Sequence, residues 1–343
     1  MSDRFVSPAV DTDDGDEAQL RPRLLEDFIG QHQLRENLRV FISAARERGE
    51  ALDHVFFSGP PGLGKTTLAA IVANELGVEF RSTSAPALEK TGDLVAILTS
   101  LGMHHVFFID EIHRLRPPIE ELLYTAMEDY EVDVVIGEGA SARTIKIPLP
   151  RFTLVGATTK TGLVSAPLFS RFGITTRLDL YTKDEIGEIV DRTSSLLELE
   201  LAEEVRPRLA QSSRGTPRVA IRLVRRMRDY AQVWGDGRLS AEVVERGLNA
   251  LEIDRFGLDI TDRKILGIII DRYGGGPVGI ETLAISVGET PDTLEDVYEP
   301  YLVQSGFLKR TARGRMATDL ALKHIKKYEK EGGGTGARSG FLF

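Results

Sequence analysis

The feature that most constrains this chain is the stretch GPPGLGKTT, residues 59–67. It follows a short apolar run, HVFFS (54–58), and leads directly into a helical pattern, KTTLAAIVANEL. Glycines at these positions let consecutive backbone N–H groups converge on phosphate groups at a helix N-terminus. A strand, a glycine-rich loop and a helix in this order predict a P-loop that binds a nucleoside triphosphate. The residues that we expect to contact the nucleotide here are Gly62, Gly64, Lys65, Thr66 and Thr67.

Two P-loop side chains and two carboxylates have distinct predicted roles. Lys65 is expected to reach the β- and γ-phosphates, and Thr66 to supply its hydroxyl to a magnesium ion. A later apolar run, HVFFID (105–110), ends in Asp110 and is followed by Glu111. Asp110 can hold magnesium through water, and Glu111 can orient or deprotonate the attacking water. An isolated Asp-Glu pair is more often a solvated surface feature, but the P-loop upstream favours ATP hydrolysis.

The histidines close to these carboxylates do not indicate a metal site. His104, His105 and His113 lack the spacing of metal ligands. The carboxylates already provide the oxygen ligands that a hard cation prefers. We therefore expect each histidine to have a structural or surface role.

The first half of the chain alternates short apolar runs with helical patterns. The expected strands are HVFFS (54–58), VEFRS (78–82), HVFFID (105–110), FTLVGAT (152–158) and TTRLDL (175–180). Apolar strands that alternate with helices indicate a parallel sheet covered on both faces. Two alternating runs joined by EGASA break this pattern and predict a hairpin at 130–149, with VDVVI facing solvent.

Beyond this region the strand pattern stops and helical periodicity begins. Residues 183–255 read as a small helical domain. Residues 256–330 read as helical segments around 261–272, 280–287 and 292–304, followed by a strand, a basic turn and a returning strand, which is the pattern of a winged helix. The large domain then covers 20–182, between an acidic tail (1–19) and a glycine-rich tail (331–343), both expected to be flexible.

Charge and composition narrow the function classes. The net charge is −9, but residues 301–330 carry eight basic and two acidic side chains, whereas residues 1–19 carry six acids and one arginine. A basic C-terminal segment favours nucleic-acid binding despite the net charge. The chain has no cysteine, which excludes disulfides and thiol catalysis. The N-terminal segment lacks the apolar core of a secretory signal and the apolar runs are too short to span a membrane, so we expect a cytoplasmic protein.

One arginine stands alone in the run SAPLFSRFGI, residues 165–174. Arg171 has no acidic residue among its ten neighbours, and a guanidinium stays charged. Its partner must be water, a residue elsewhere in the sequence, or a group on another molecule.

The motifs GPPGLGKTT, FIDEIH, GATT, SRFG and GTPR, in this order, resemble those of AAA+ ATPases. LRPRLLEDFIGQ near the start and GFLKRTARGRMAT near the end resemble the RuvB family of bacterial Holliday junction branch-migration motors. The resemblance covers about residues 18–328. It implies an α/β fold: a P-loop AAA+ core with a parallel sheet, a helical lid domain and a C-terminal winged helix. It also implies a hexameric ring around duplex DNA, a role with RuvA and RuvC in recombination and repair during the SOS response to DNA damage, and ATP and Mg²⁺ as cofactors.

The same resemblance assigns roles to further residues. It casts Thr159 of GATT as sensor 1, Arg218 of GTPR as sensor 2, and Arg171 as an arginine finger offered to a neighbouring subunit. The remaining nucleotide contacts that it implies are Leu20, Arg21 and Tyr181 around the base and sugar, and Glu128, Asp129 and Tyr130 at the subunit interface. The sequence departs from the family at Lys160, where many relatives have arginine, and in PLFSRFG, where PLRDRFG is frequent. The second departure leaves Arg171 as the only candidate finger in the stretch.

Two segments are expected to meet partners. The hairpin 130–149 resembles the RuvA-docking element of the family, although a plain sheet decoration explains it equally well from sequence alone. In the basic turn, Arg310 and Arg315 match DNA-contacting arginines of the family, and Arg313 lies between them. Basic side chains on a hairpin tip suit phosphate contacts, which position a protein without reading sequence.

Two other functions share parts of this pattern. A replication-initiator-like switch also joins an AAA+ core to a winged helix, but uses ATP to control assembly. A clamp-loader-like ATPase loads another ring and usually carries a Ser-Arg-Cys finger, whereas this chain has SRF.

Overall fold

The computed structural model describes residues 19–136 and 143–330. Contacts divide the chain into two compact units, with the division between Asp179 and Leu180. The expected tails, apart from residue 19, and the tip of the expected hairpin lie outside the described residues. Each unit is described by itself.

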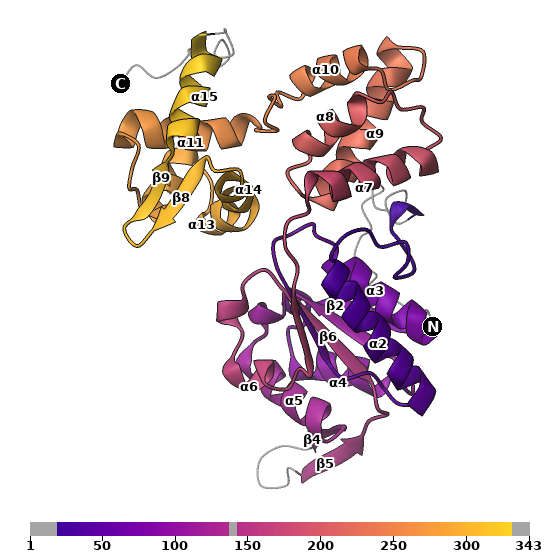
Figure 1. Ribbon diagram of the computed structural model, residues 1–343. Helices are drawn as coiled ribbons and strands as arrows, with labels where there is room; N and C mark the ends of the chain where they lie inside the picture. The colour runs from indigo at the N-terminus through magenta and orange to yellow at the C-terminus, as the bar shows by residue number, and fades with distance from the viewer. Residues whose placement is uncertain (1–18, 137–142, 331–343) are drawn as a thin grey trace, which may run out of the picture. The chain divides into compact units, whose positions relative to one another are not determined.

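The first unit is built on a parallel five-stranded sheet, of which Figure 1 labels β2 and β6. The strand order is β2-β3-β6-β1-β7. The strands are β1 (Val55–Ser58), β2 (Phe80–Ser84), β3 (Val106–Asp110), β6 (Thr153–Thr158) and β7 (Ile174–Arg177). β1 and β6 are buried along their whole length, as continuous apolar strands under two helical layers must be. The expected parallel sheet is confirmed. The edge strands β2 and β7 differ from the expected bounds by a few residues, because their half-exposed residues give a weaker apolar pattern.

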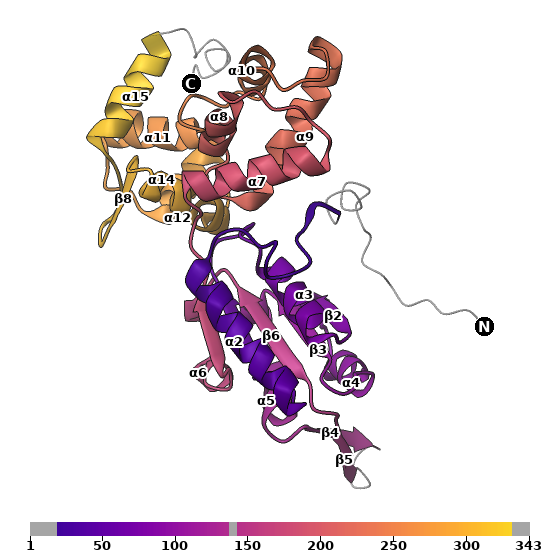
Figure 2. The same cartoon turned by 45° about the vertical axis from the view of Figure 1, so that its right-hand side comes forward.

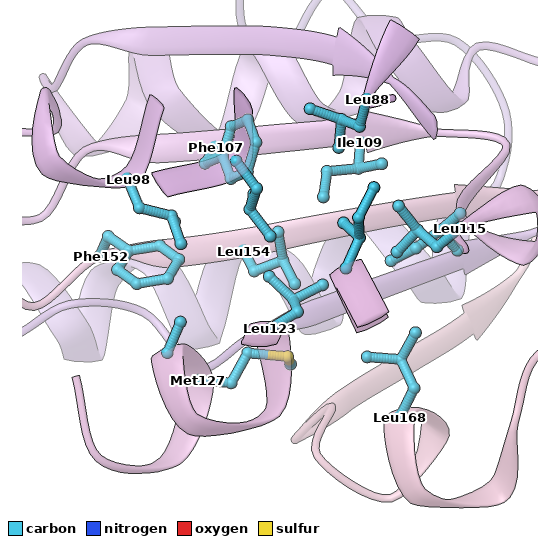
Figure 3. Close-up of a cluster of buried hydrophobic side chains, with 14 of the residues drawn as sticks. Leu88, Leu98, Phe107, Ile109, Leu115, Leu123, Met127, Phe152, Leu154 and Leu168 are labelled. Atoms are coloured by element: carbon cyan, nitrogen blue, oxygen red, sulfur yellow. The ribbon is translucent and has the colours of Figure 1, made fainter. Parts of the chain in front are cut away.

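Helices cover both faces of this sheet. They are α2 (His32–Arg48), α3 (Lys65–Leu76), α4 (Thr91–Thr99), α5 (Pro117–Glu128) and α6 (Ala166–Phe169). α3 packs on β3, β6 and β2, and α2 packs on α3. The connections through α4, α5 and α6 cross the sheet in the opposite direction, so these helices cover the other face. On that face, Leu98 of α4, Leu123 and Met127 of α5 and Leu168 of α6 share one apolar cluster with Phe107 and Leu154 of the sheet (Figure 3).

The expected hairpin consists of β4 (Glu131–Ile136) and β5 (Arg143–Pro148), which project next to α5 (Figures 1 and 2). The expectation that VDVVI faces solvent is wrong for two of its residues. Val132 is completely buried and Val134 packs against the core cluster, because alternation along β4 turns them toward α5 while Asp133 faces out. Ile145, opposite Val134 on β5, is 47% exposed.

The second unit begins with helices, as the periodicity predicted, and the structure shows four of them. They are α7 (Lys183–Leu196), α8 (Val205–Ser212), α9 (Pro217–Trp234) and α10 (Ala241–Ala250). Thr182 and Glu185 form a capping box at the start of α7. α9 is strongly amphipathic and buries Leu223, Val224 and Met227.

The second unit ends in the expected winged helix. Its elements are α11 (Ile260–Tyr273), α12 (Ile280–Val287), α13 (Pro291–Thr293), the π-helical turn η5 (Leu294–Tyr298), α14 (Glu299–Gln304), β8 (Leu308–Thr311), β9 (Gly314–Ala317) and α15 (Asp319–Lys330). The third expected helix is therefore interrupted by a π-helical turn, and α15 was not foreseen as a helix. Of the described helices, none combines the length and the apolar character needed to cross a membrane.

Candidate nucleotide site and nucleic-acid interface

The glycine-rich loop joins β1 to the N-terminus of α3. Gly59 has φ 138°, and a Cβ there would lie 2.4 Å from the carbonyl oxygen of Leu178. Gly64, which precedes the helix, has φ 99°. Only glycine adopts such backbone geometry without strain. In the described part of the chain, no acidic side chain lies in the first turn of α3, so its free N–H groups form an electropositive end suited to phosphate.

Lys65 holds the loop closed. Its ammonium group donates hydrogen bonds to the carbonyl oxygens of Gly59 at 2.7 Å and Pro60 at 2.8 Å. The residue is buried, with 8% of its surface exposed. Thr66 and Thr67 follow in the first helical turn and are half-buried. A lysine held across a P-loop in this way is placed for phosphate contact.

The sheet brings three predicted residues to one edge. In parallel strands the carboxyl ends lie together, and β3, β6 and β1 are neighbours. Asp110 ends β3, Thr159 follows β6, and the P-loop follows β1. Asp110, Thr159 and Lys65 therefore meet at the carboxyl edge, where ligands bind in open α/β sheets.

Glu111 has an unusual backbone next to this edge. Its φ of 49° and ψ of 42° are in the left-handed region, which non-glycine residues rarely adopt and which is concentrated at functional sites. Its carboxylate accepts a hydrogen bond from Arg114 at 2.8 Å, and Asp110 Oδ1 accepts one from the Glu111 N–H at 2.9 Å. The turn after β3 therefore carries the two neighbouring carboxylates of Asp110 and Glu111.

Sequence reasoning missed a link across this edge. Nδ1 of His113 lies 2.9 Å from the hydroxyl of Thr158, which also accepts a hydrogen bond from the Lys160 N–H at 2.9 Å. The turn after β3 is thereby connected to the loop that carries Thr159. The other two histidines also have structural contacts, since the N–H of His104 donates to the carbonyl of Arg151 and the ring of His105 accepts from Gly102.

Glu128, Asp129 and Tyr130 lie at the opposite edge of the sheet. His54, the residue before β1, places Nε2 3.2 Å from the carbonyl oxygen of Met127, the residue before Glu128. β1 has four residues, about 13 Å of strand, between that end and the P-loop. The structure therefore does not bring these three residues to the P-loop of their own chain.

Arg171 lies at this same far edge. It precedes β7, whose first residue Ile174 pairs with Val55 at the start of β1. Its guanidinium lies 3.1 Å from the carboxylate of Glu128 and donates to the carbonyl of Pro167 at 2.6 Å. The anionic partner missing from the local sequence is thus supplied by α5.

Leu20 and Arg21 belong to the first unit, whereas Tyr181 and Arg218 belong to the second. Leu20 and Tyr181 are buried. The N–H of Tyr181 donates to the carbonyl of Gly215 at 2.9 Å, in the loop before α9. Arg218 is exposed in the first turn of α9.

The three arginines of the wing differ in accessibility. Arg313 is exposed in the turn between β8 and β9, and the Arg310 side chain is 59% exposed. The Arg315 side chain is only 10% exposed and forms ion pairs with Glu299 and, at 2.5 Å, with Glu295. Arg310 lies opposite Arg315 on the neighbouring strand and pairs with the same glutamates, at 3.3 Å and 3.5 Å, but it stays largely exposed. Contrary to the simple expectation of three DNA-facing arginines, the Arg315 side chain is thus mostly buried against Glu295 and Glu299.

Three family models match nearly the whole chain between residues 20 and 326. The models of the Holliday junction DNA helicase RuvB P-loop domain, the RuvB AAA lid domain and the RuvB C-terminal winged helix domain match residues 20–178, 181–254 and 255–326.

Curated relatives and solved structures give the same answer. The Holliday junction branch migration complex subunit RuvB of Treponema denticola is 60% identical over 327 residues, which is 95% of each chain. That of Treponema pallidum is 58% identical over 93% of this chain and 91% of its own length. The solved structure of the Thermotoga maritima RuvB Holliday junction branch migration motor has a TM-score of 0.83 and 51% identity, covering 90% of this chain and 98% of that chain. Three consecutive domain matches and relatives at this identity show that the chain belongs to the RuvB family.

Proposed function

We propose that this chain is an ATP-driven motor that moves duplex DNA and thereby drives branch migration of Holliday junctions in recombination and repair. The observation that carries the proposal is the P-loop with Lys65, Asp110 and Thr159 at one sheet edge, in a chain whose relatives are named for Holliday junction branch migration.

The residues at the carboxyl edge fit ATP with magnesium. Backbone N–H groups of the loop from Gly62 to Thr67 and the ammonium of Lys65 would hold the phosphates. Thr66 and Asp110 would hold Mg²⁺, which when bound neutralises phosphate charge. Glu111 would orient or deprotonate the attacking water once its carboxylate turns from Arg114. Thr159 would contact the γ-phosphate as sensor 1, and Leu20, Arg21, Tyr181 and Arg218 would complete the site.

The position of Arg171 supports an oligomeric active site. It lies at the sheet edge opposite the P-loop of its own chain, so the ATP that it serves as a finger would belong to a neighbouring subunit. Glu128, Asp129 and Tyr130 would lie at that same interface. Repetition of this head-to-tail contact closes a ring, for which we propose six subunits around duplex DNA.

The wing would contact DNA through phosphates. Arg313 and Arg310 are exposed there and carry the charge that backbone binding needs. Arg310 and Arg315 both pair with Glu295 and Glu299, but the Arg310 side chain is 59% exposed and that of Arg315 only 10%. We therefore propose that Arg315 stabilises the wing and that Arg310 and Arg313 contact DNA.

We also propose partners, domain bounds and a location. The hairpin 130–149 would dock RuvA, and the exposed Ile145 on β5 supports a partner surface. RuvC would act on the same junction, as part of the SOS response.

We keep 20–182, 183–255 and 256–330 as the proposed domains. We place the protein in the cytoplasm, with which its cysteine-free sequence is compatible. The comparisons do not favour the initiator-like switch or the clamp loader.

The decisive experiment incubates the protein with ATP and a synthetic four-way junction, with and without RuvA. We expect ATP-dependent conversion of the junction into two duplexes, faster with RuvA. A Lys65→Ala chain should give none. Absence of junction dissociation under both conditions would contradict the motor function.

A further inference from the structure

Helix α5 has an apolar face that packs into the core and, next to it, a polar stripe that lies beside Arg171. Leu123 and Met127 point into the apolar cluster, which Leu168 of α6 also enters (Figure 3). Glu120, Tyr124 and Glu128 are spaced four residues apart and therefore lie along one neighbouring stripe of the helix. α6 packs against α5, so this polar stripe is held at a fixed place beside the loop of Arg171.

The hydroxyl of Tyr124 is anchored to both helices. It donates to Glu120 Oε1 at 2.6 Å and lies 3.1 Å from the hydroxyl of Ser165. Ser165 also donates to Glu120 and caps α6 by accepting from the Leu168 N–H at 3.2 Å. Partial burial, together with the hydrogen bond to Glu120, raises the pKa of Tyr124, so the hydroxyl remains a neutral donor at physiological pH.

The ring of Tyr124 supports the guanidinium of Arg171. The central carbon of the guanidinium lies 4.5 Å from the ring centroid, within the range of a cation–π contact. Pro167 and Glu128 bind the two terminal nitrogens. Nε of Arg171 is buried and has no hydrogen-bond partner among the described residues, so the stacked ring is what packs this end of the side chain. A side chain 20% exposed is thus fixed in direction by three contacts.

We propose that Tyr124, anchored by Glu120 and Ser165, is a positioning residue for Arg171. This inference rests on the proposed role of Arg171 at a neighbouring subunit's ATP. Glu128 is 56% exposed and forms a surface ion pair, which is weak and exchangeable. A phosphate of the neighbour can replace the Glu128 carboxylate at the guanidinium, while the ring stays beneath it and keeps its plane and reach. Positional precision of this kind is what makes a charged group effective in a transition state.

The test combines Tyr124→Leu, which removes the ring, with Tyr124→Phe, which keeps the ring and removes the hydroxyl. Tyr124→Leu should lower kcat about tenfold, the rate equivalent of one partly desolvated cation–π contact, with KM changed less than about twofold. Tyr124→Phe should recover most of that loss. Glu120→Gln, which only weakens the anchor, should have a smaller effect in the same direction. Tyr230→Leu removes a tyrosine that stacks on Trp234 in the lid, and is the matched control expected to leave kcat unchanged.

A double-mutant cycle separates positioning from a general structural defect. The measured quantity is the affinity of the full-length protein for ADP with aluminium fluoride, relative to ADP alone. Tyr124→Leu should lower this relative affinity about tenfold in the wild-type background and leave it unchanged in an Arg171→Ala background.

Three outcomes would overturn the inference, two of them for Tyr124 alone and one for Arg171 as well. Tyr124→Leu could weaken the relative affinity for the analogue equally in both backgrounds, or it could weaken it in neither while Arg171→Ala clearly does. Either result would overturn the role of Tyr124 alone. Tight binding of the transition-state analogue by Arg171→Ala would overturn the proposed role of Arg171 as well.

Discussion

The guanidinium of Arg214 donates a hydrogen bond at 3.0 Å to the completely buried carboxyl group of Asp262. A second terminal nitrogen donates to Asp259 at 3.1 Å. Arg214 lies in the loop between α8 and α9, four residues before the proposed sensor Arg218, and Asp262 lies in the first turn of α11. The lid and the winged helix are therefore joined by a buried ion pair. Arg214 has φ 57°, in the left-handed region that non-glycine residues rarely adopt.

Replacing Arg214 should destabilise the second unit. Removing one partner of a buried ion pair leaves the other uncompensated, so at a pH above about 7, where Asp262 is ionised, Arg214→Ala should lower the free energy of unfolding by about 3 kcal/mol. The single tryptophan, Trp234, lies in α9, so its fluorescence during urea unfolding reports on this unit. Arg238→Ala is the control, because Arg238 pairs with Glu200 at the surface and should cost less than about 1 kcal/mol. Equal effects of the two substitutions would contradict this assignment.

The same joint predicts a pH dependence. Burial raises the pKa of Asp262 from 3.8 to about 7, against the opposing attraction of Arg214. The folded chain therefore holds a proton that the unfolded chain has lost. This contribution to stability is fully present below about pH 4 and is lost as the pH rises through 7.

Asp262→Asn removes this titration. The free energy of unfolding of the wild type, relative to that of Asp262→Asn, should fall as the pH rises from about 4 to about 7 and then level off. Urea titrations of both proteins across this range measure the difference. A difference that is constant with pH would contradict the raised pKa.

Local patterns predicted most of the fold. The P-loop, the buried strands and the amphipathic helices are short segments, from the four residues of β1 to the eighteen of α9, whose local residue pattern predicts the structure. The prediction that this part of the hairpin faces solvent was wrong for Val132 and Val134. Alternation along a strand shows that it has two faces, but does not tell which of them is covered.

The sequence did not predict the long-range ion pairs of these arginines. The partner of Arg171 is Glu128 on α5, and Arg315 pairs with Glu295 and Glu299 across the winged helix. Such pairs depend on which helix the chain packs against, and no sequence spacing records that choice. The family resemblance supplied roles for both arginines, but neither in-chain partner.

Arg171→Ala should abolish turnover and leave nucleotide binding nearly intact. A finger neutralises charge that develops on the transferred phosphoryl group, an effect worth about 10³ to 10⁵ in rate. Steady-state ATP hydrolysis and the Kd for ATP measure the two quantities. Arg177→Ala is the matched control, because the Arg177 side chain on β7 is 76% exposed and pairs only loosely with Asp179.

Mixing experiments test whether Arg171 acts on a neighbour. In rings that mix wild-type and Arg171→Ala subunits, the ATPase activity should fall by more than the fraction of Arg171→Ala subunits in the mixture. If equal mixing with wild type merely halved the activity, that result would contradict action in trans.

The wing gives a prediction that separates binding from folding. Arg313→Ala should weaken binding to all duplex sequences alike and reduce the salt slope of the affinity by about one unit, because Arg313 is exposed and a phosphate contact releases counterions. Arg315→Ala should instead lower the thermal stability of the winged helix, because it removes the closer and more buried of the two arginines that pair with Glu299, 3% exposed, and leaves only Arg310 at 3.5 Å. Fluorescence anisotropy with labelled DNA at several salt concentrations and thermal unfolding distinguish the two. If Arg315→Ala changed DNA affinity and salt slope with no loss of stability, Arg315 would be a DNA contact after all.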